Sequence, residues 1–337
     1  MTLALKIDYR LGGTPKYRLV GESDNLMQIP DEIRKSVVFI CYKAADGMKL
    51  AGTAFFISIT VKESGILFSY IITAKHIIDG IRSKSINQKV YLRINLKVGG
   101  ADLVETPIEN WLMHPTESDV DVAILNWAPS QETFDYRFIP LEMAATQEII
   151  KTQNIGVGDD VFLTGLFRNH YGSQRNMPII RVGNIASMPE EKVHTTWGDI
   201  DAYLIEARSI GGLSGSPVFA FIGSMRRIDG AMHLGRSGYL FYLLGLMHGH
   251  FDLSHLELDD LSRDSLINLQ INIGIAIVVP VWKIIEVMNQ KALIDMRELT
   301  IRKEQGKILS TLDTSTDISP IVHTWSVNLA AISGVFG

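Results

Sequence analysis

Short runs rich in β-branched and aromatic residues follow one another along most of this chain of 337 residues. The first series occupies residues 37–42, 53–61, 67–73, 89–96, 101–108 and 120–126. The second series occupies residues 160–166, 179–185, 202–207, 217–222, 239–247 and 273–279. Turn signals separate the runs, and they do not alternate regularly with segments of helical period. Many short strands in succession are typical of a β-sandwich or a β-barrel. The sequence therefore predicts an all-β fold.

The two series divide the chain into four predicted parts. Residues 1–35 carry Gly, Pro and mixed charge with little periodicity, and we expect an N-terminal arm there. Residues 36–140 and residues 141–291 each hold one series of runs, and each predicts one β-barrel. The second barrel ends with a helix that begins after Pro280, because a helix readily starts after a proline. Residues 292–337 predict a C-terminal tail that is helical at first and apolar at its end.

Composition limits the class of protein and its setting. Hydrophobic residues make up 46% of the chain, which is enough for large buried cores. The net charge is −5 and both signs are mixed along the chain, so a nucleic acid is not the expected partner. The N-terminus lacks a basic region followed by an apolar one, and no apolar run is long enough to span a membrane. Cys41 is the single cysteine; we expect it in the core of a cytoplasmic protein without intrachain disulfides.

A glycine-rich turn, GGLSGSP at residues 211–217, separates two of the predicted strands. Glycines on both sides of Ser214 allow a tight turn and a close approach of a substrate carbonyl. Such a turn can direct the N–H groups of Gly212 and Ser214 toward one point, where they would stabilise an oxyanion. Ser214 is therefore a candidate nucleophile. A turn of the same composition without any chemistry is the alternative, and such turns are common.

Two segments upstream supply the groups that a serine nucleophile needs. Residues 71–78 place His76 just after an apolar run, and residues 119–125 place Asp119 and Asp121 at the start of another. Serine is a weak nucleophile at neutral pH and needs an adjacent base, for which a histidine held by a carboxylate is suited. The purely structural alternative is a hydrogen-bonded core histidine and a carboxylate that caps the start of a strand.

These three segments resemble the motifs of the chymotrypsin-fold serine proteases. TAKH at 73–76 is similar to T-A-x-H, DVAIL at 121–125 to D-[LIV]-A-[LIV]-L, and GLSGSP at 212–217 to G-x-S-G-G-P. Within that clan the chain is most similar to the bacterial HtrA-like (Deg-type) branch. Three further segments carry this likeness: GTAFFI at 52–57, VGDDVF at 157–162 and IGIAIVVP at 273–280.

The resemblance implies two six-stranded antiparallel barrels, a C-terminal helix and an active site between the barrels. It implies a Ser-His-Asp triad of His76, Asp121 and Ser214, and its register favours Asp121 over Asp119. The implied activity is cleavage of protein or peptide substrates through an acyl-enzyme, without a cofactor or a metal. Ser216 departs from the motif by replacing a glycine, and the 292–337 tail is too short for the PDZ domain usual in that branch.

The resemblance also implies where a substrate pocket would lie. Its walls would come from the segment before the nucleophile, with Arg208 and Ile210, and from a later strand with Met247, His248 and His250. No acidic residue occupies these two walls, so a preference for Lys or Arg before the scissile bond is not expected. Arginine binds carboxylates in bidentate fashion, which favours an acidic or amide side chain there. A small apolar pocket, with Arg208 turned toward solvent, is the alternative.

The sequence also allows other functions. The chain could be a binding module that keeps a protease fold without turnover, or a latent protease that a protein partner activates. The surfaces for such a partner would be the N-terminal arm, the insertions at 168–176, 225–236 and 252–272, and the C-terminal tail. An α/β-hydrolase would use Ser214 with a later histidine, for which the candidates are His233, His248 and His255. His248, His250 and Asp252 could together bind a metal, although surface or pocket histidines are commoner.

Overall fold

A computed structural model describes residues 4–8, 16–20, 29–62, 64–195, 198–207, 212–223, 225–228, 231–234, 241–252 and 272–313. The chain divides into two compact units, residues 1–31 and 32–337. The smaller unit contains an antiparallel pair of strands, β1 (Ala4–Asp8) and β2 (Lys16–Val20). Within the described residues, the larger unit contains an eight-stranded sheet and a closed barrel, and the described candidate site residues lie in these strands or in the segments that connect them.

The first sheet of the larger unit has eight strands within the described residues, in the order β7-β6-β3-β4-β5-β9-β8, with β10 paired to β4. The strands are β3 (Val37–Ala44), β4 (Gly47–Val61), β5 (Ile66–Thr73), β6 (Lys89–Asn95), β7 (Ala101–Pro107), β8 (Leu112–Met113), β9 (Ala123–Leu125) and β10 (Ile139–Pro140). Its strand pairs are antiparallel except for β10 and β4, which are parallel. The sequence predicted six strands here. Strands β8 and β10 were missed because two residues are too few to show an alternation of buried and exposed side chains.

The sheet keeps the expected alternation where one face is exposed and loses it where both are covered. In β6 the side chains of Val90, Leu92 and Ile94 are buried, and those between them are less so. In β4 the consecutive residues 52–58 are all buried. This continuous burial indicates that the middle of β4 is packed on both faces.

The second sheet is a closed barrel of six antiparallel strands in the order β11-β12-β15-β20-β19-β16. Its strands are β11 (Asp160–Gly165), β12 (Ile179–Ser187), β15 (Tyr203–Glu206), β16 (Pro217–Phe221), β19 (Phe241–Asp252) and β20 (Asn272–Pro280). Side chains such as Tyr203, Val218, Leu244 and Val278 fill it. The predicted all-β class and this six-stranded barrel are confirmed. The interpretation as an α/β-hydrolase is wrong, because that fold needs a mostly parallel sheet and every strand pair of this barrel is antiparallel.

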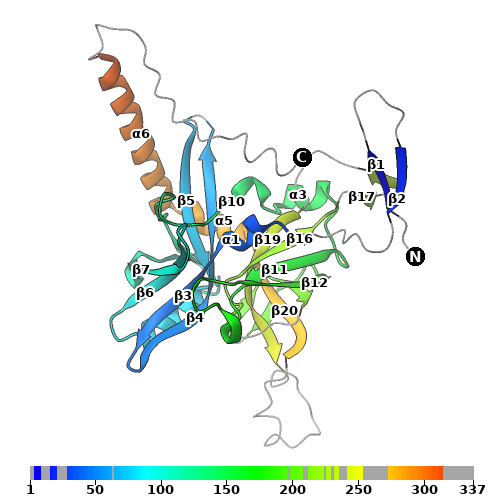
Figure 1. Cartoon of the computed structure of the whole chain (residues 1–337), viewed down its shortest axis with the longest axis horizontal. Helices are drawn as coiled ribbons and strands as arrows, with labels where there is room; N and C mark the ends of the chain where they lie inside the picture. The colour runs from blue at the N-terminus through cyan, green and yellow to red at the C-terminus, as the bar shows by residue number, and fades with distance from the viewer. Residues whose placement is uncertain are drawn as a thin grey trace, which may run out of the picture. The chain divides into compact units, whose positions relative to one another are not determined.

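Helices and short hairpins complete the larger unit (Figure 1). The α-helices are α1 (Asp31–Lys35), α2 (Lys75–Lys84), α3 (Gln147–Thr152), α5 (Val281–Met288) and α6 (Lys291–Asp313). Single turns of 3-10 helix are η1 (Ile108–Asn110), η2 (Leu141–Met143) and η3 (Arg168–His170). The hairpins are β13 (Val193–Thr195) with β14 (Gly198–Ile200) and β17 (Met225–Ile228) with β18 (Ala231–Leu234). Helix α5 confirms the helix expected after Pro280. In the described part of the chain, no helix combines the length and the apolar character needed to cross a bilayer.

Candidate active site

His76 lies in the first turn of α2, directly after β5 ends at Thr73. Ile77, Ile78 and Ile81 of this helix are buried, with 5% or less of their surface exposed. These three side chains fix the helix against the sheet. The imidazole of His76 is thereby held at the end of a central strand, with about one-fifth of its side chain exposed.

Asp121 lies in the connection between β8 and β9 and binds His76 through both carboxylate oxygens. The backbone N–H of His76 donates to Oδ1 at 2.8 Å, and the ring Nδ1 lies 2.7 Å from Oδ2. A proton on Nδ1 donates to the carboxylate, which makes Nε2 the basic nitrogen of the ring. Asp119, the competing carboxylate, instead lies 3.8 Å from the ammonium of Lys192. The structure thus places Asp121 beside His76 and places Asp119 elsewhere.

The environment shifts the pKa values of this pair in opposite directions. Burial by itself raises the pKa of Asp121, but the charges and hydrogen bonds of His76 and His248 outweigh it and hold that pKa well below its usual range. Burial by itself lowers the pKa of His76, but the nearby Asp121 carboxylate outweighs it and raises that pKa above 6.5. Asp121 is therefore an anion at neutral pH, suited to stabilise an imidazolium on His76.

His248, in β19 of the second barrel, binds the same carboxylate. Its Nδ1 lies 2.5 Å from Oδ2 of Asp121, and 5% of its side chain is exposed. Its ring meets that of His76 edge to face, with centroids 5.5 Å apart. The sequence assigned His248 to a substrate pocket, so its position against Asp121 differs from that prediction. The bond joins residues 127 apart in the sequence, and only the packing of the barrels brings them together.

The turn that carries Ser214 depends on its glycines. Gly212 and Gly215 have φ angles of 109° and 81°, which side chains of L-residues rarely adopt. A Cβ added at Gly215 would lie 2.1 Å from the carbonyl oxygen of Thr53, so no larger residue fits there. Within the described residues, neither the N–H of Gly212 nor that of Ser214 donates a hydrogen bond. Both groups are thus available as the oxyanion donors that the sequence predicts.

Thr53, in β4, attaches the first sheet to this turn. Its N–H donates to the carbonyl oxygen of Ser214 at 3.0 Å, and its hydroxyl donates to the carbonyl oxygen of Gly212 at 2.9 Å. The same hydroxyl accepts from the N–H of Leu166 at 2.8 Å. Thr73, just before α2, donates its hydroxyl to the carbonyl oxygen of Thr53 at 2.7 Å. The GTAFFI segment predicted a strand but gave no sign of this role.

Gly52 lets the two halves of the site come together. A Cβ added there would lie 2.4 Å from Cδ1 of Ile77 and 3.1 Å from the carbonyl oxygen of Ser214. Ile77 follows His76 in α2, so the bare backbone of Gly52 lies between the histidine helix and the serine turn. The absence of a side chain at this position allows that approach.

Three of the five residues predicted to form a substrate pocket, Met247, His248 and His250, are among the described residues. Arg208 and Ile210 lie outside the described residues. Met247 is fully buried in the core of the second barrel, because its side chain points into the closed barrel. A pocket wall formed by this strand stays a prediction. The backbone N–H of Met247 donates to the carbonyl oxygen of Ser216 at 2.8 Å, and its C=O accepts from the N–H of Gly215 at 2.7 Å. His250 is partly exposed on the same strand.

Among the residues that the structure describes, two groups of side chains have the composition of a metal site. In the group of His76, Asp121 and His248, the bonded atoms lie 2.5 and 2.7 Å apart, a hydrogen-bond distance. Ligands of one zinc ion, each about 2.0–2.2 Å from it, lie farther apart than that. In the group of His114, Glu117 and Glu286, the ammonium of Lys283 already lies 2.9 and 3.0 Å from the two carboxylates. Asp252, the third member of the ligand set considered from the sequence, has a side chain outside the described part.

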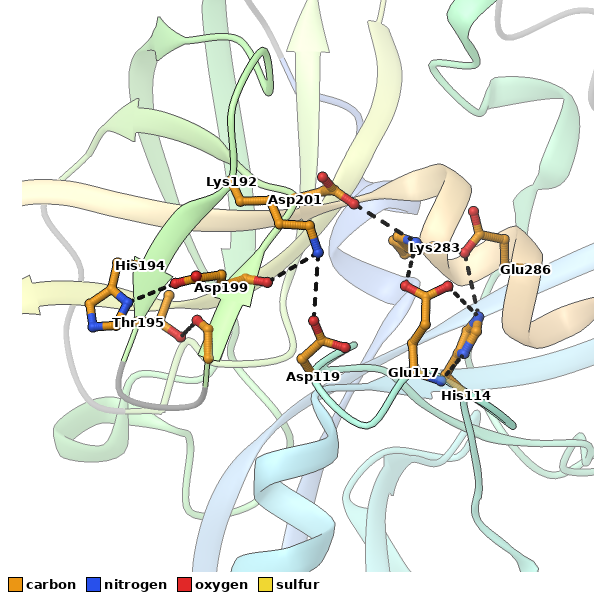
Figure 2. Close-up of polar contacts among 11 residues, drawn as sticks. His114, Glu117, Asp119, Lys192, His194, Thr195, Asp199, Asp201, Lys283 and Glu286 are labelled. Atoms are coloured by element: carbon orange, nitrogen blue, oxygen red, sulfur yellow. Dashed lines mark hydrogen bonds and ion pairs between the residues drawn. The ribbon is translucent and has the colours of Figure 1, made fainter.

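A network of ion pairs joins Glu117, in the connection between β8 and β9, to Lys283 of α5 and its neighbours (Figure 2). Lys283 of α5 reaches Glu117 and, at 3.8 Å, Asp201. His114 accepts the backbone N–H of Glu117 at 2.9 Å and lies 3.4 Å from the carboxylate of Glu286. Glu117, Asp121 and Lys283 also line one small cavity. The segment that carries Asp121 is therefore held by charges from the other barrel.

Comparison with known proteins gives likenesses in structure alone. No protein-family profile matches the chain, and no curated protein matches it in sequence. The protease domain of MamO from Magnetospirillum magneticum, in its apo form, has a TM-score of 0.43 and 14% identity, over 75% of this chain and 96% of that one. An inactive serine-to-alanine form of Rv3671c from M. tuberculosis H37Rv has a TM-score of 0.39 and 16% identity, over 76% and 87% of the two chains.

Proposed function

We propose that the chain is a serine endopeptidase with a triad of Ser214, His76 and Asp121. The observation that supports this most is the two-point bond between Asp121 and His76, which sets the ring orientation and the tautomer that a general base requires. Ser214 is carried by a turn bonded to β4, the strand next to the one that leads into His76.

The reaction follows from the roles of these groups. His76 accepts the proton of the Ser214 hydroxyl as Oγ attacks the scissile carbonyl carbon, and Asp121 stabilises the imidazolium that forms. The N–H groups of Gly212 and Ser214 stabilise the oxyanion of the tetrahedral intermediate. His76 then gives its proton to the leaving amine, and water releases the acyl group by the same route. Side chains and backbone groups supply each step, so the proposal includes no cofactor.

The proposed substrates are protein or peptide chains. An activating protein partner that binds the insertions or the C-terminal tail stays a prediction from the sequence. The preference before the scissile bond also stays a prediction, because Arg208 lies outside the described residues. A binding module without turnover is the competing function, and such a module would not label with a fluorophosphonate at Ser214.

The test is labelling with a fluorophosphonate, together with cleavage of a proteome-derived peptide library. The wild type should label at Ser214 and cleave peptides, whereas Ser214→Ala and His76→Ala should each lose most turnover. The double variant should lose little more, because triad residues act as a unit. Asp121→Asn should cost about 10⁴-fold, as in the well-studied serine proteases. Asp119→Asn is the matched control and should stay near wild type. A folded wild type that neither labels nor cleaves would support the binding module.

A further inference from the structure

His248 joins the carboxylate of the candidate triad to the barrel that carries the serine. His76 lies in the helix after β5 and Asp121 in the connection between β8 and β9, both attached to the first sheet, whereas Ser214 lies in a turn of the second barrel. In the described part of the chain, His248 is the side chain of the second barrel that hydrogen-bonds Asp121. It is nearly fully buried, as is Asp121. This bond is therefore made where water does not compete for the carboxylate.

The residue beside His248 holds the serine turn. The backbone of Met247 donates to the carbonyl oxygen of Ser216 and accepts from the N–H of Gly215, at 2.8 and 2.7 Å. Two consecutive residues of β19 thus hold the two catalytic halves: Met247 through the serine turn and His248 through the acid. A shift of this strand would move both together, so their relative position is kept.

The two oxygens of the Asp121 carboxylate differ in their number of hydrogen-bond donors among the described residues. Oδ1 accepts the backbone N–H of His76, and Oδ2 lies within hydrogen-bond distance of both imidazoles. An N–H on Nδ1 of His248 therefore gives the anionic carboxylate a second donor at Oδ2. Loss of that donor would leave a buried carboxylate oxygen with one bond, free to rotate away from His76.

We propose that His248 is a positioning residue, which holds the Asp121 carboxylate in the orientation that serves His76 and aligns it with the Ser214 turn. This inference rests on the proposed protease function. To hold the Asp121 carboxylate, residue 248 needs only an N–H donor at the position of Nδ1. It needs neither the basicity nor the shape of the imidazole ring.

Two substitutions at this position separate the donor from the ring. His248→Asn keeps an N–H donor near the place of Nδ1, whereas His248→Leu fills the space without a donor. His248→Leu should lower kcat by about 10- to 100-fold, the effect of one hydrogen bond to a buried charge, with KM changed much less. His248→Asn should recover most of that loss. His194→Leu, an exposed histidine on β13, is the control and should leave kcat and KM as they are. A His248→Leu enzyme with wild-type kcat, or a His248→Asn enzyme as slow as His248→Leu, would overturn the proposal.

A spectroscopic measurement tests the bond without relying on turnover. In Ser214→Ala protein, proton NMR should show two low-field imidazole N–H signals, one from His76 and one from His248. The added His248→Asn substitution should remove one signal and keep the other, and this variant serves if His248→Leu fails to fold. A single low-field signal in the Ser214→Ala parent would overturn the inference. If the wild type does not label with a fluorophosphonate while the Ser214→Ala protein shows both signals, the proposed function is contradicted but the bond between His248 and Asp121 is supported.

Discussion

At the scale of single residues, the charge of Asp121 determines the pH at which His76 can act. The carboxylate raises the pKa of His76 above 6.5, so protonated His76 persists to a higher pH than an ordinary histidine would. A general base must first lose that proton, so activity should be low below the raised pKa and high above it. Asp79 and His248 also face His76, and Asp79 adds to the rise. We expect the acidic limb of kcat/KM against pH to fall at a pKa above 6.5.

The Asp121→Asn variant checks the cause of that limb. Without the carboxylate charge, burial of the imidazole is left to lower the pKa of His76, and the limb should move to lower pH. Residual activity of this variant, measured across the same pH range, gives the comparison. A limb that stays in place or moves upward would show that Asp121 does not set the pKa of His76.

Ser216 offers a test of stability close to the same turn. Its hydroxyl is fully buried and has no hydrogen-bond partner among the described residues. It lies over Gly165, where an added Cβ would come within 1.9 Å of the hydroxyl oxygen. An unsatisfied buried hydroxyl costs about 1–3 kcal/mol, so Ser216→Ala should raise the free energy of unfolding by about 1 kcal/mol. Urea denaturation measures this change, and a Ser216→Ala protein that is less stable than wild type would mean that the hydroxyl has a partner.

At the scale of elements, β4 lies against the serine turn of the second barrel, and Thr53 makes the hydrogen bonds between them. Thr53→Val keeps the shape but leaves the N–H of Leu166 and the carbonyl oxygen of Gly212 without their bond to the hydroxyl. We expect a loss of about 2–4 kcal/mol in the free energy of unfolding, from two buried groups left unsatisfied. Labelling of Ser214 by the fluorophosphonate should also slow, because the turn loses an anchor.

The control for this prediction is Thr53→Ser, which keeps the hydroxyl and removes one methyl group. It should cost about 1 kcal/mol and leave the labelling rate near wild type. Equal losses in the two variants, by urea denaturation, would show that Thr53 matters for its packing and not for its hydrogen bonds.

The elements also show what the sequence can and cannot predict. Strands such as β5 and β6 were predicted nearly to the residue, because several β-branched and apolar residues in a row identify them. The candidate triad was accessible because each member lies in a short local motif. Thr53 and His248 were not recognised in these roles, since their partners are 159 and 127 residues away. Contacts across such separations depend on how the two sheets pack, and no local pattern records that packing.

At the scale of the whole molecule, the two sheets must keep a fixed relation for Ser214 and His76 to meet. Lys283 contributes to that relation from α5, next to the second barrel, with 8% of its surface exposed. Burial lowers its pKa, but its bonds to Glu117 and Glu286 outweigh burial and raise the pKa, so the ammonium stays charged. Glu117 precedes Asp121 by four residues in the same connection, so the ion pair holds the segment that carries the acid (Figure 2).

Replacing Lys283 by methionine should therefore destabilise the protein more than replacing an exposed lysine. The two glutamates are about two-fifths exposed, so water screens them in part, and we expect a loss of about 1–3 kcal/mol rather than the full cost of an unpaired buried charge. Lys192→Met is the matched control. The Lys192 side chain is about half exposed, and its ammonium comes no closer than 3.8 Å to the Asp119 carboxylate, so this substitution should cost less than about 0.5 kcal/mol. A double-mutant cycle of Lys283→Met with Glu117→Gln should show a coupling energy between the two sites. Independent effects in that cycle, or equal losses in the two lysine variants, would mean that the ion pair does not join the barrels.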